Sequence, residues 1–280
     1  MWLIYALATV ALTSVLAILM RVLAVRADDE RAFAFSYNLI GLIVLACLLL
    51  VNGIGSVNLN PYLFSLLILS GLGYGFFQRY QFSVRKRIEA SELAIILTPT
   101  NIAGYILAVV WLHEAVTVWQ VLGFAILMVA AVMVIAKHHK VTFTRYTMLA
   151  LVIGLGLAIT APLDRRVSPF FSQVLTYAAF IWLAQTIVTF IPYVKVSKIK
   201  RELQIHRWKL PLLVLINLCA TYTLIAAIKM APATKVQPVT ASNVILVAIL
   251  GIIILKERNR VWLKITAAIL ATIGLVLISR

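Results

Sequence analysis

Charged residues are scarce in this sequence. Only 12% of the 280 residues are Asp, Glu, Lys or Arg, against about a quarter in a soluble domain. Acidic residues are the rarest, with 9 Asp and Glu against 25 Lys and Arg, while 63% of all residues are apolar. Such a chain needs lipid as its solvent, so the composition excludes an ordinary soluble protein and predicts a membrane protein.

Cysteine and histidine are also few, with 2 and 4 residues. Cys47 and Cys219 lie inside apolar runs, and the histidines lie near predicted loops without Cys or carboxylate partners at metal-binding spacing. We therefore expect no disulfide framework, no metal site and no cofactor. Because a nucleophile elbow and a Gly-rich phosphate loop are also missing, we expect that the protein is not an enzyme.

Carboxylates are missing from the middle of every apolar run. Exporters that exchange lipophilic cations for protons need such a carboxylate inside the membrane. The sequence therefore disfavours the export of cationic drugs by that mechanism. Asp164 stands beside Arg165 at the end of an apolar run, and we interpret the two as a local ion pair.

Ten apolar runs fill most of the chain. A helix needs about 20 residues to cross a hydrocarbon core of about 30 Å. The sequence thus predicts an all-α integral membrane protein with ten transmembrane helices, near residues 2–25, 32–51, 61–82, 89–112, 117–136, 146–163, 169–193, 210–229, 233–255 and 261–279. Little remains for a soluble domain, so we attribute the net charge of +16 to membrane topology and expect no nucleic-acid partner.

The basic residues are distributed unevenly over the loops. All but five of the 25 Lys and Arg lie in or beside the odd-numbered loops, and the exceptions are Arg165, Arg166, Lys229, Lys235 and Arg280. By the positive-inside rule, the odd loops are cytoplasmic and both termini lie outside. We expect the prokaryotic inner (cell) membrane as the location. The longest connection, Val194 to Lys209, is predicted to be a solvated basic loop at the membrane surface.

An internal repeat divides the chain into residues 1–140 and 141–280. A shift of 143 residues lays Leu112, Glu114, Val118, Trp119, Ala125, Ile126, Leu127 and Ile135 onto the identical residues Leu255, Glu257, Val261, Trp262, Ala268, Ile269, Leu270 and Ile278. With five spans in each half, the second half must enter the membrane from the opposite side. The sequence therefore predicts two inverted five-helix repeats, an architecture typical of alternating-access transporters.

A short turn occurs at the same place in each repeat, Leu112-His113-Glu114 and Leu255-Lys256-Glu257, and is followed by a span with Gly123 or Gly274. In this turn, in length and in duplication, the chain resembles the EamA-type transporters of the drug/metabolite transporter superfamily. The resemblance implies a central substrate cavity surrounded by helices 1, 3, 4, 6, 8 and 9, with helices 5 and 10 at the periphery. This chain lacks the basic residue that the family usually has near the start of helix 2, since none occurs between Phe33 and Asn38.

Polar residues inside the spans are candidates for the cavity wall, since unpaired polar groups are costly in hydrocarbon. Tyr74 and Gln78 share one face of helix 3, and the repeat shift places Asn217 and Thr221 opposite them. The alternative is hydrogen bonding between packed helices, worth about 0.6 kcal/mol per contact.

Prolines mark a second pair of candidate positions. Pro99 and Pro238 stand amid polar residues, and a proline within a span bends or breaks the helix, as in transporter binding sites. We expect substrate contacts from neighbouring Thr98, Asn101, Gln237, Thr240 and Asn243. The alternative is a kink tolerated for packing.

The sequence thus favours a secondary transporter that moves a small polar metabolite, an amino acid or a similar neutral or zwitterionic solute, with export preferred. An anionic metabolite is a second option, through contact with Arg79, which could equally reach toward the lipid headgroups. A membrane enzyme or a scaffold that does not transport is a third. The expected partners are a small-molecule substrate and the lipid bilayer, and the oligomeric state stays open.

Overall fold

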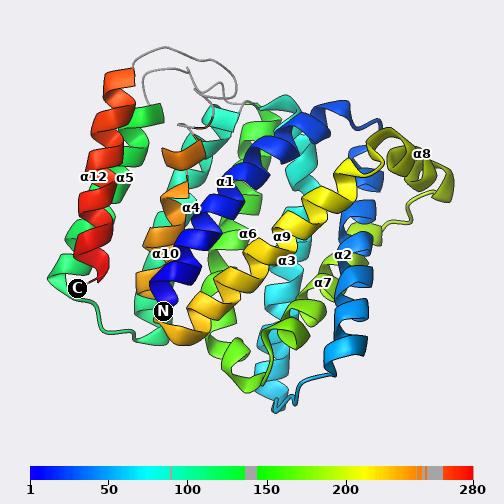
Figure 1. The fold of residues 1–280 in the computed structure, drawn as a ribbon, viewed down its shortest axis with the longest axis horizontal. Helices are drawn as coiled ribbons and strands as arrows, with labels where there is room; N and C mark the ends of the chain where they lie inside the picture. The colour runs from blue at the N-terminus through cyan, green and yellow to red at the C-terminus, as the bar shows by residue number, and fades with distance from the viewer. Residues whose placement is uncertain (89, 136–143, 244, 248–249, 251–260, 280) are drawn as a thin grey trace.

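Helices form nearly all of the described chain (Figure 1). The computed structural model describes residues 1–88, 90–135, 144–243, 245–247, 250 and 261–279. The first half contains α1 (Trp2–Arg26), α2 (Glu30–Asn52), α3 (Pro61–Arg87), α4 (Ala90–Leu112) and α5 (Val118–Ile135). The second contains α6 (Arg145–Val167), a 3₁₀ turn η1 (Ser168–Phe170), α7 (Val174–Phe190), α8 (Val196–His206), α9 (Lys209–Met230), α10 (Ala233–Ala241) and α12 (Val261–Ser279).

Side-chain caps fix where several helices begin. The Asp29 carboxylate accepts hydrogen bonds from the first backbone N–H groups of α2, and the Asn60 amide oxygen accepts one from Leu63 in α3. Pro61 follows Asn60, at a position where its missing N–H leaves no helical bond unmade. Thr144 and Thr147 form a reciprocal capping box at the start of α6.

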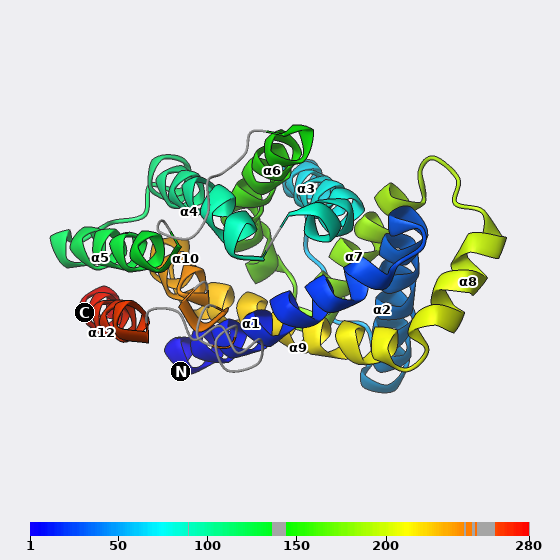
Figure 2. The same cartoon turned by 90° about the horizontal axis from the view of Figure 1, so that it is seen from above.

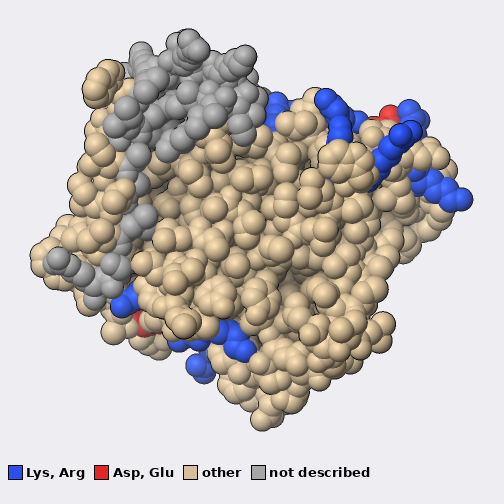
Figure 3. All heavy atoms as spheres, in the orientation of Figure 1, with Lys and Arg blue, Asp and Glu red and all other residues tan. Residues whose placement is uncertain are grey.

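Among the described residues, four helices are long and apolar enough to cross a membrane, namely α1, α2, α6 with η1, and α9. Shorter apolar helical stretches occur at Ile102–Leu112, Val118–Ala130 and Val174–Phe190. On the face seen in Figure 3, Lys and Arg side chains gather at two opposite ends, and the described surface between them is uncharged. This distribution is the one expected of helices that pass through a hydrocarbon layer.

The helices pair across the two halves (Figure 2). Helix α1 packs on α9 and α10 of the second half, while α6 packs on α3 and α4 of the first. Helix α2 packs on α7, and α5 packs on α12. Counterpart helices thus exchange partners between the halves, as they do about a two-fold axis.

Two glycines let α5 and α12 approach closely. A Cβ atom built on Gly123 would lie 2.6 Å from the Gly274 carbonyl oxygen, and one on Gly274 would lie 2.8 Å from the Gly123 oxygen. Backbone therefore touches backbone where the two helices meet, which small residues permit in membrane helices.

The structure corrects two sequence predictions about the second half. The span predicted at 169–193 starts later, at Val174, because η1 and Phe171 precede it and Phe171 pairs with Val57 in an isolated β-bridge. The connection predicted as a solvated loop contains helix α8, in which Glu202 and His206 are buried. The Glu202 carboxylate accepts hydrogen bonds from the backbone N–H groups of Asp28 and Asp29, so α8 is fastened to the α1–α2 turn.

Candidate functional site

A cavity of about 370 Å³ lies between the halves, with walls from α1, α3, α4, α6, α7, α9 and α10. Six of these helices are the ones that the family resemblance places around the cavity, with α9 and α10 as the eighth and ninth spans. Helix α7 also contributes to the wall, through Tyr177, Ile181 and Gln185. Neither α5 nor α12 contributes a described residue to the wall. The cavity is therefore built at the centre of the two repeats.

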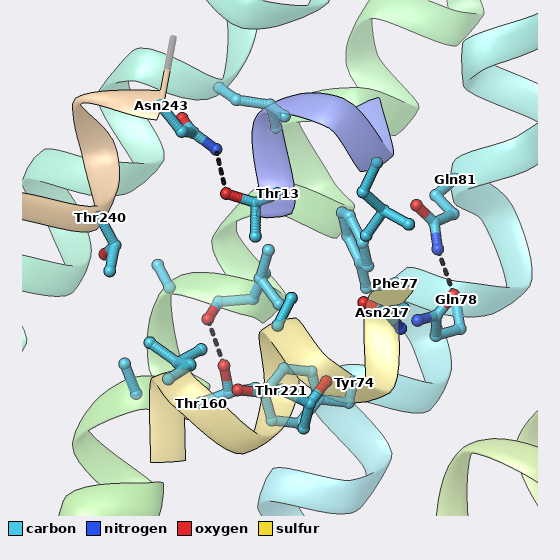
Figure 4. A pocket seen from close by; sticks show the side chains of 18 of the residues that line it. Thr13, Tyr74, Phe77, Gln78, Gln81, Thr160, Asn217, Thr221, Thr240 and Asn243 are labelled. Atoms are coloured by element: carbon cyan, nitrogen blue, oxygen red, sulfur yellow. Dashed lines mark hydrogen bonds between the residues drawn. The ribbon is translucent and has the colours of Figure 1, made fainter. Parts of the chain in front are cut away.

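The candidates on α3 and α9 meet in this cavity. Tyr74, Gln78, Asn217 and Thr221 all line it, and their side chains surround the same pocket in Figure 4. Gln81 joins them, and its amide donates a hydrogen bond to the Gln78 side-chain oxygen. Amide and hydroxyl groups of α3 and α9 thus meet in this wall, among apolar residues such as Phe77 and Leu224.

The second candidate cluster reaches the cavity through α10 and the residues after it. Gln237, Thr240 and Asn243 line it, and the Asn243 amide donates to the Thr13 hydroxyl at 3.4 Å (Figure 4). Pro238 is buried inside α10, which ends three residues later at Ala241.

The matching segment of the first half behaves differently. Helix α4 runs through Pro99 without a break, because one proline removes a single backbone hydrogen bond and need not end a helix. The structure shows no interruption of α4 at Pro99, and a role of this proline in shaping the helix stays a prediction. The side chains of Thr98, Pro99 and Asn101 lie outside the described part of the chain, but neighbouring Thr100 lines the cavity.

Arg79 does not line the cavity. Its guanidinium donates to the Val188 carbonyl oxygen at 3.0 Å, so it is directed at α7. Arg85 lines the cavity instead, and its Nε donates to the Gln81 side-chain oxygen at 3.3 Å. Arg85 continues the face of Tyr74, Gln78 and Gln81 at helical spacing, and that spacing was the signal in the sequence that could have identified it.

Asp164 overturns the earlier interpretation of its carboxylate. Because α6 extends to Val167, Asp164 lies inside the helix, fully buried, and lines the cavity. It accepts hydrogen bonds from the hydroxyls of Ser70, Tyr74 and Tyr177. Arg165 points away, to the Ile228 carbonyl oxygen at 2.7 Å, so the two residues form no local ion pair. Asp164 stands three residues before the end of α6, so a carboxylate at the end of a span lines the cavity, and no described span carries one at its middle.

The turn at Leu112-His113-Glu114 joins the two halves. The Glu114 carboxylate accepts hydrogen bonds from the backbone N–H groups of Ala233 and Thr234 at 2.9 and 2.8 Å, and from the Thr234 hydroxyl at 2.8 Å. Arg165 Nε lies 3.7 Å from the same carboxylate. A side chain of the first half therefore caps the N-terminus of α10 in the second, where the helix dipole favours a negative charge.

A metal site requires several ligating side chains close together. Within the described ranges, no group of three or more His, Cys, Asp and Glu residues lies close enough together to hold a metal ion.

Comparisons with known proteins agree with this architecture. A model of the EamA-like transporter family matches residues 1–136 and again residues 144–280, so the chain belongs to this family, in the drug/metabolite transporter superfamily. It is an integral, multi-pass membrane protein. No curated protein matches the sequence. One solved crystal structure of a protein, 15% identical, covers 99% of this chain and 95% of its own length with a TM-score of 0.74, a likeness of fold alone.

Proposed function

We propose that the chain is a secondary transporter that moves a small polar metabolite, an amino acid or a similar neutral or zwitterionic solute, by alternating access, with export preferred. The observation that carries this proposal is the cavity between the halves. Its volume of about 370 Å³ falls in the range of small-molecule sites, and amides and hydroxyls from both repeats line it.

We further propose that ten spans form two inverted repeats, residues 1–140 and 141–280. The exchange of helix partners between the halves supports this topology. Both chain ends lie at the same end of the molecule in Figure 1, as an even number of spans requires. The charge distribution over the loops supports an outside location for that end.

The contacts of Glu114 support the alternating-access step. They tie the first repeat to α10 and Arg165 of the second, at the end of the molecule where the α4–α5 turn lies (Figure 1). If the halves rock against each other, these contacts must break when that end opens. Glu114 is thus a latch between the repeats in the closed state of this face.

An anionic metabolite is the second candidate substrate. The residue that supports it is Arg85, which lines the cavity, rather than Arg79, which does not. The carboxylate of Asp164 in the same cavity opposes a substrate of uniform negative charge. A zwitterion suits one charge of each sign better. No described contact favours a membrane enzyme or a scaffold over a transporter.

Counterflow tests this function. Purified protein in liposomes preloaded with an unlabelled compound should accumulate the labelled form of the same compound, drawn from a panel of amino acids and related metabolites. Gln78→Ala and Asn217→Ala should each reduce the initial rate at least tenfold, because each removes a polar group from the cavity. Thr266→Ala, on the exposed surface of α12, is the matched control and should leave the rate unchanged. Accumulation of no compound, or equal rates in all three variants, would contradict the proposal.

A further inference from the structure

The carboxyl group of Asp164 is buried and has no cationic partner among the described residues. The residue has no exposed surface, and each of its three hydrogen bonds comes from a neutral hydroxyl. None of the ion pairs among the described residues involves it. Hydroxyl donors satisfy lone pairs, but they leave the charge itself uncompensated.

The cationic side chains of α6, α9 and α10 form no described ion pair with Asp164. On α6, Arg165 binds the Ile228 and Lys229 carbonyl oxygens, and Arg166 is exposed. On α9, Lys229 donates to the Phe171 carbonyl oxygen at 2.6 Å. From α3 and α7 the groups that face Asp164 are the hydroxyls of Ser70, Tyr74 and Tyr177, and from η1 the nearest polar side chain is Ser168, while Lys235 of α10 is partly exposed.

The site can accept one more donor. A carboxylate has about four lone-pair positions, and three are used here. Tyr74 is half-buried and lines the cavity together with Asp164, and its hydroxyl lies 2.7 Å from the carboxylate. Rotation of the Tyr74 side chain would therefore let a group from the cavity reach the carboxylate.

The opposite part of the cavity carries the opposite charge. Arg85 lies eleven residues after Tyr74 on α3, about 16 Å along the helix axis. The repeat shift places Arg21 at the position of Asp164, so the two repeats differ in the sign of charge there. A substrate with an ammonium group would be oriented with that group toward Asp164.

We propose that Asp164 is an exchangeable cation site, which holds a proton in the empty cavity and binds the ammonium group of an amine-bearing substrate. The proposal rests on the transport function above and narrows its substrate class. When the substrate binds, the O–H bond of the Asp164 carboxyl breaks and the proton leaves through the open face. An ammonium N–H then donates to the freed carboxylate oxygen. Substrate binding thereby becomes coupled to the release of one proton, and low pH weakens it.

Proton release on binding tests this site directly. Full-length protein in detergent and weak buffer, with a pH indicator dye, is titrated with L-threonine and putrescine. Matched compounds without the amine are 2,3-dihydroxybutyrate and 1,4-butanediol. We expect the amines, and not the matched compounds, to release up to one proton per protein. In Asp164→Asn the release should vanish and the affinity for amines should fall about thirtyfold or more.

Two further variants keep the test decisive if Asp164→Asn folds poorly. Asp164→Glu keeps the carboxyl group and should still release a proton, and Tyr74→Phe removes one donor and should do the same. If the amine-free compounds bind as tightly as the amines, or if the amines bind without proton release to folded wild-type protein, the site assignment is overturned. Counterflow distinguishes failure of the cation-site proposal from failure of the transport proposal. Transport of the amine-free compounds would contradict the cation site but would still agree with a transporter.

Discussion

Removal of the Glu114 latch should open one face of the transporter. Glu114→Ala deletes a carboxylate that accepts three hydrogen bonds from Ala233 and Thr234 at 2.8 to 2.9 Å and approaches Arg165 at 3.7 Å. These contacts join the first repeat to the second. Their loss should stabilise the conformation in which the cavity is open at this end.

The magnitude follows from the bonds that are lost. A hydrogen bond to a charged group contributes about 1.5–3 kcal/mol, and an N-cap contributes about 1 kcal/mol. Because such contributions are not additive, we expect Glu114→Ala to destabilise the closed face by roughly 2–4 kcal/mol. A change of this size shifts a two-state equilibrium by roughly 30- to 1,000-fold.

Cysteine labelling measures the shift. In a background where Cys47 and Cys219 are replaced by serine, Thr221→Cys places one thiol on the cavity wall. A membrane-impermeant maleimide applied from the Glu114 side should react faster when Glu114→Ala is added. Glu30→Ala is the matched control, since it removes ion pairs with Lys86 and Arg87 near the other end of the molecule. An unchanged rate with Glu114→Ala would refute the latch.

Three further changes have defined outcomes. Gly123→Ala should lower the unfolding temperature in detergent, because the added Cβ would lie 2.6 Å from the Gly274 oxygen and cost about 1–3 kcal/mol; an unchanged temperature would contradict the backbone contact. Arg85→Gln should lower counterflow of carboxylate-bearing substrates more than that of putrescine, and an equal loss would argue against a role in charge recognition. Burial raises the pKa of Asp29, but the hydrogen bond from Lys198 and those from two backbone N–H groups outweigh it and lower the pKa. The stabilisation by Asp29 is therefore complete above the ordinary Asp pKa and is lost as the pH falls through the lowered value, and Asp29→Asn should flatten the thermal stability profile in acid.

Much of the cavity wall could be predicted because helical spacing and duplication act together. Tyr74 and Gln78 share a helix face by their separation of four residues, and the 143-residue shift selected Asn217 and Thr221 on the counterpart helix. In a membrane, polar side chains on such paired faces avoid the lipid and face the interior of the protein. The family assignment, which rests on the turn at Glu114 and the repeat, is confirmed by the family match.

Long-range partners could not be predicted. Asp164 was expected to pair with the adjacent Arg165, but consecutive residues on a helix point in different directions. The residues that donate hydrogen bonds to Asp164 are 13 to 94 positions away in the sequence. Arg79 and Arg85 are both on α3, and only the packing of α7 shows that Arg79 turns out of the cavity. Helix α8 was missed in the sequence because it is stabilised by buried contacts with the α1–α2 turn and not by an apolar run.

The central claim is that one cavity opens to each side of the membrane in turn. Asn217→Cys in the background without Cys47 and Cys219 places a single thiol on the wall of that cavity. Vesicles with a known orientation can then be treated with an impermeant maleimide from the outside or from the lumen. Alternating access predicts that the thiol reacts from both sides, and that a reagent bound from one side blocks the other. Reaction from one side alone, or from neither, would contradict the account.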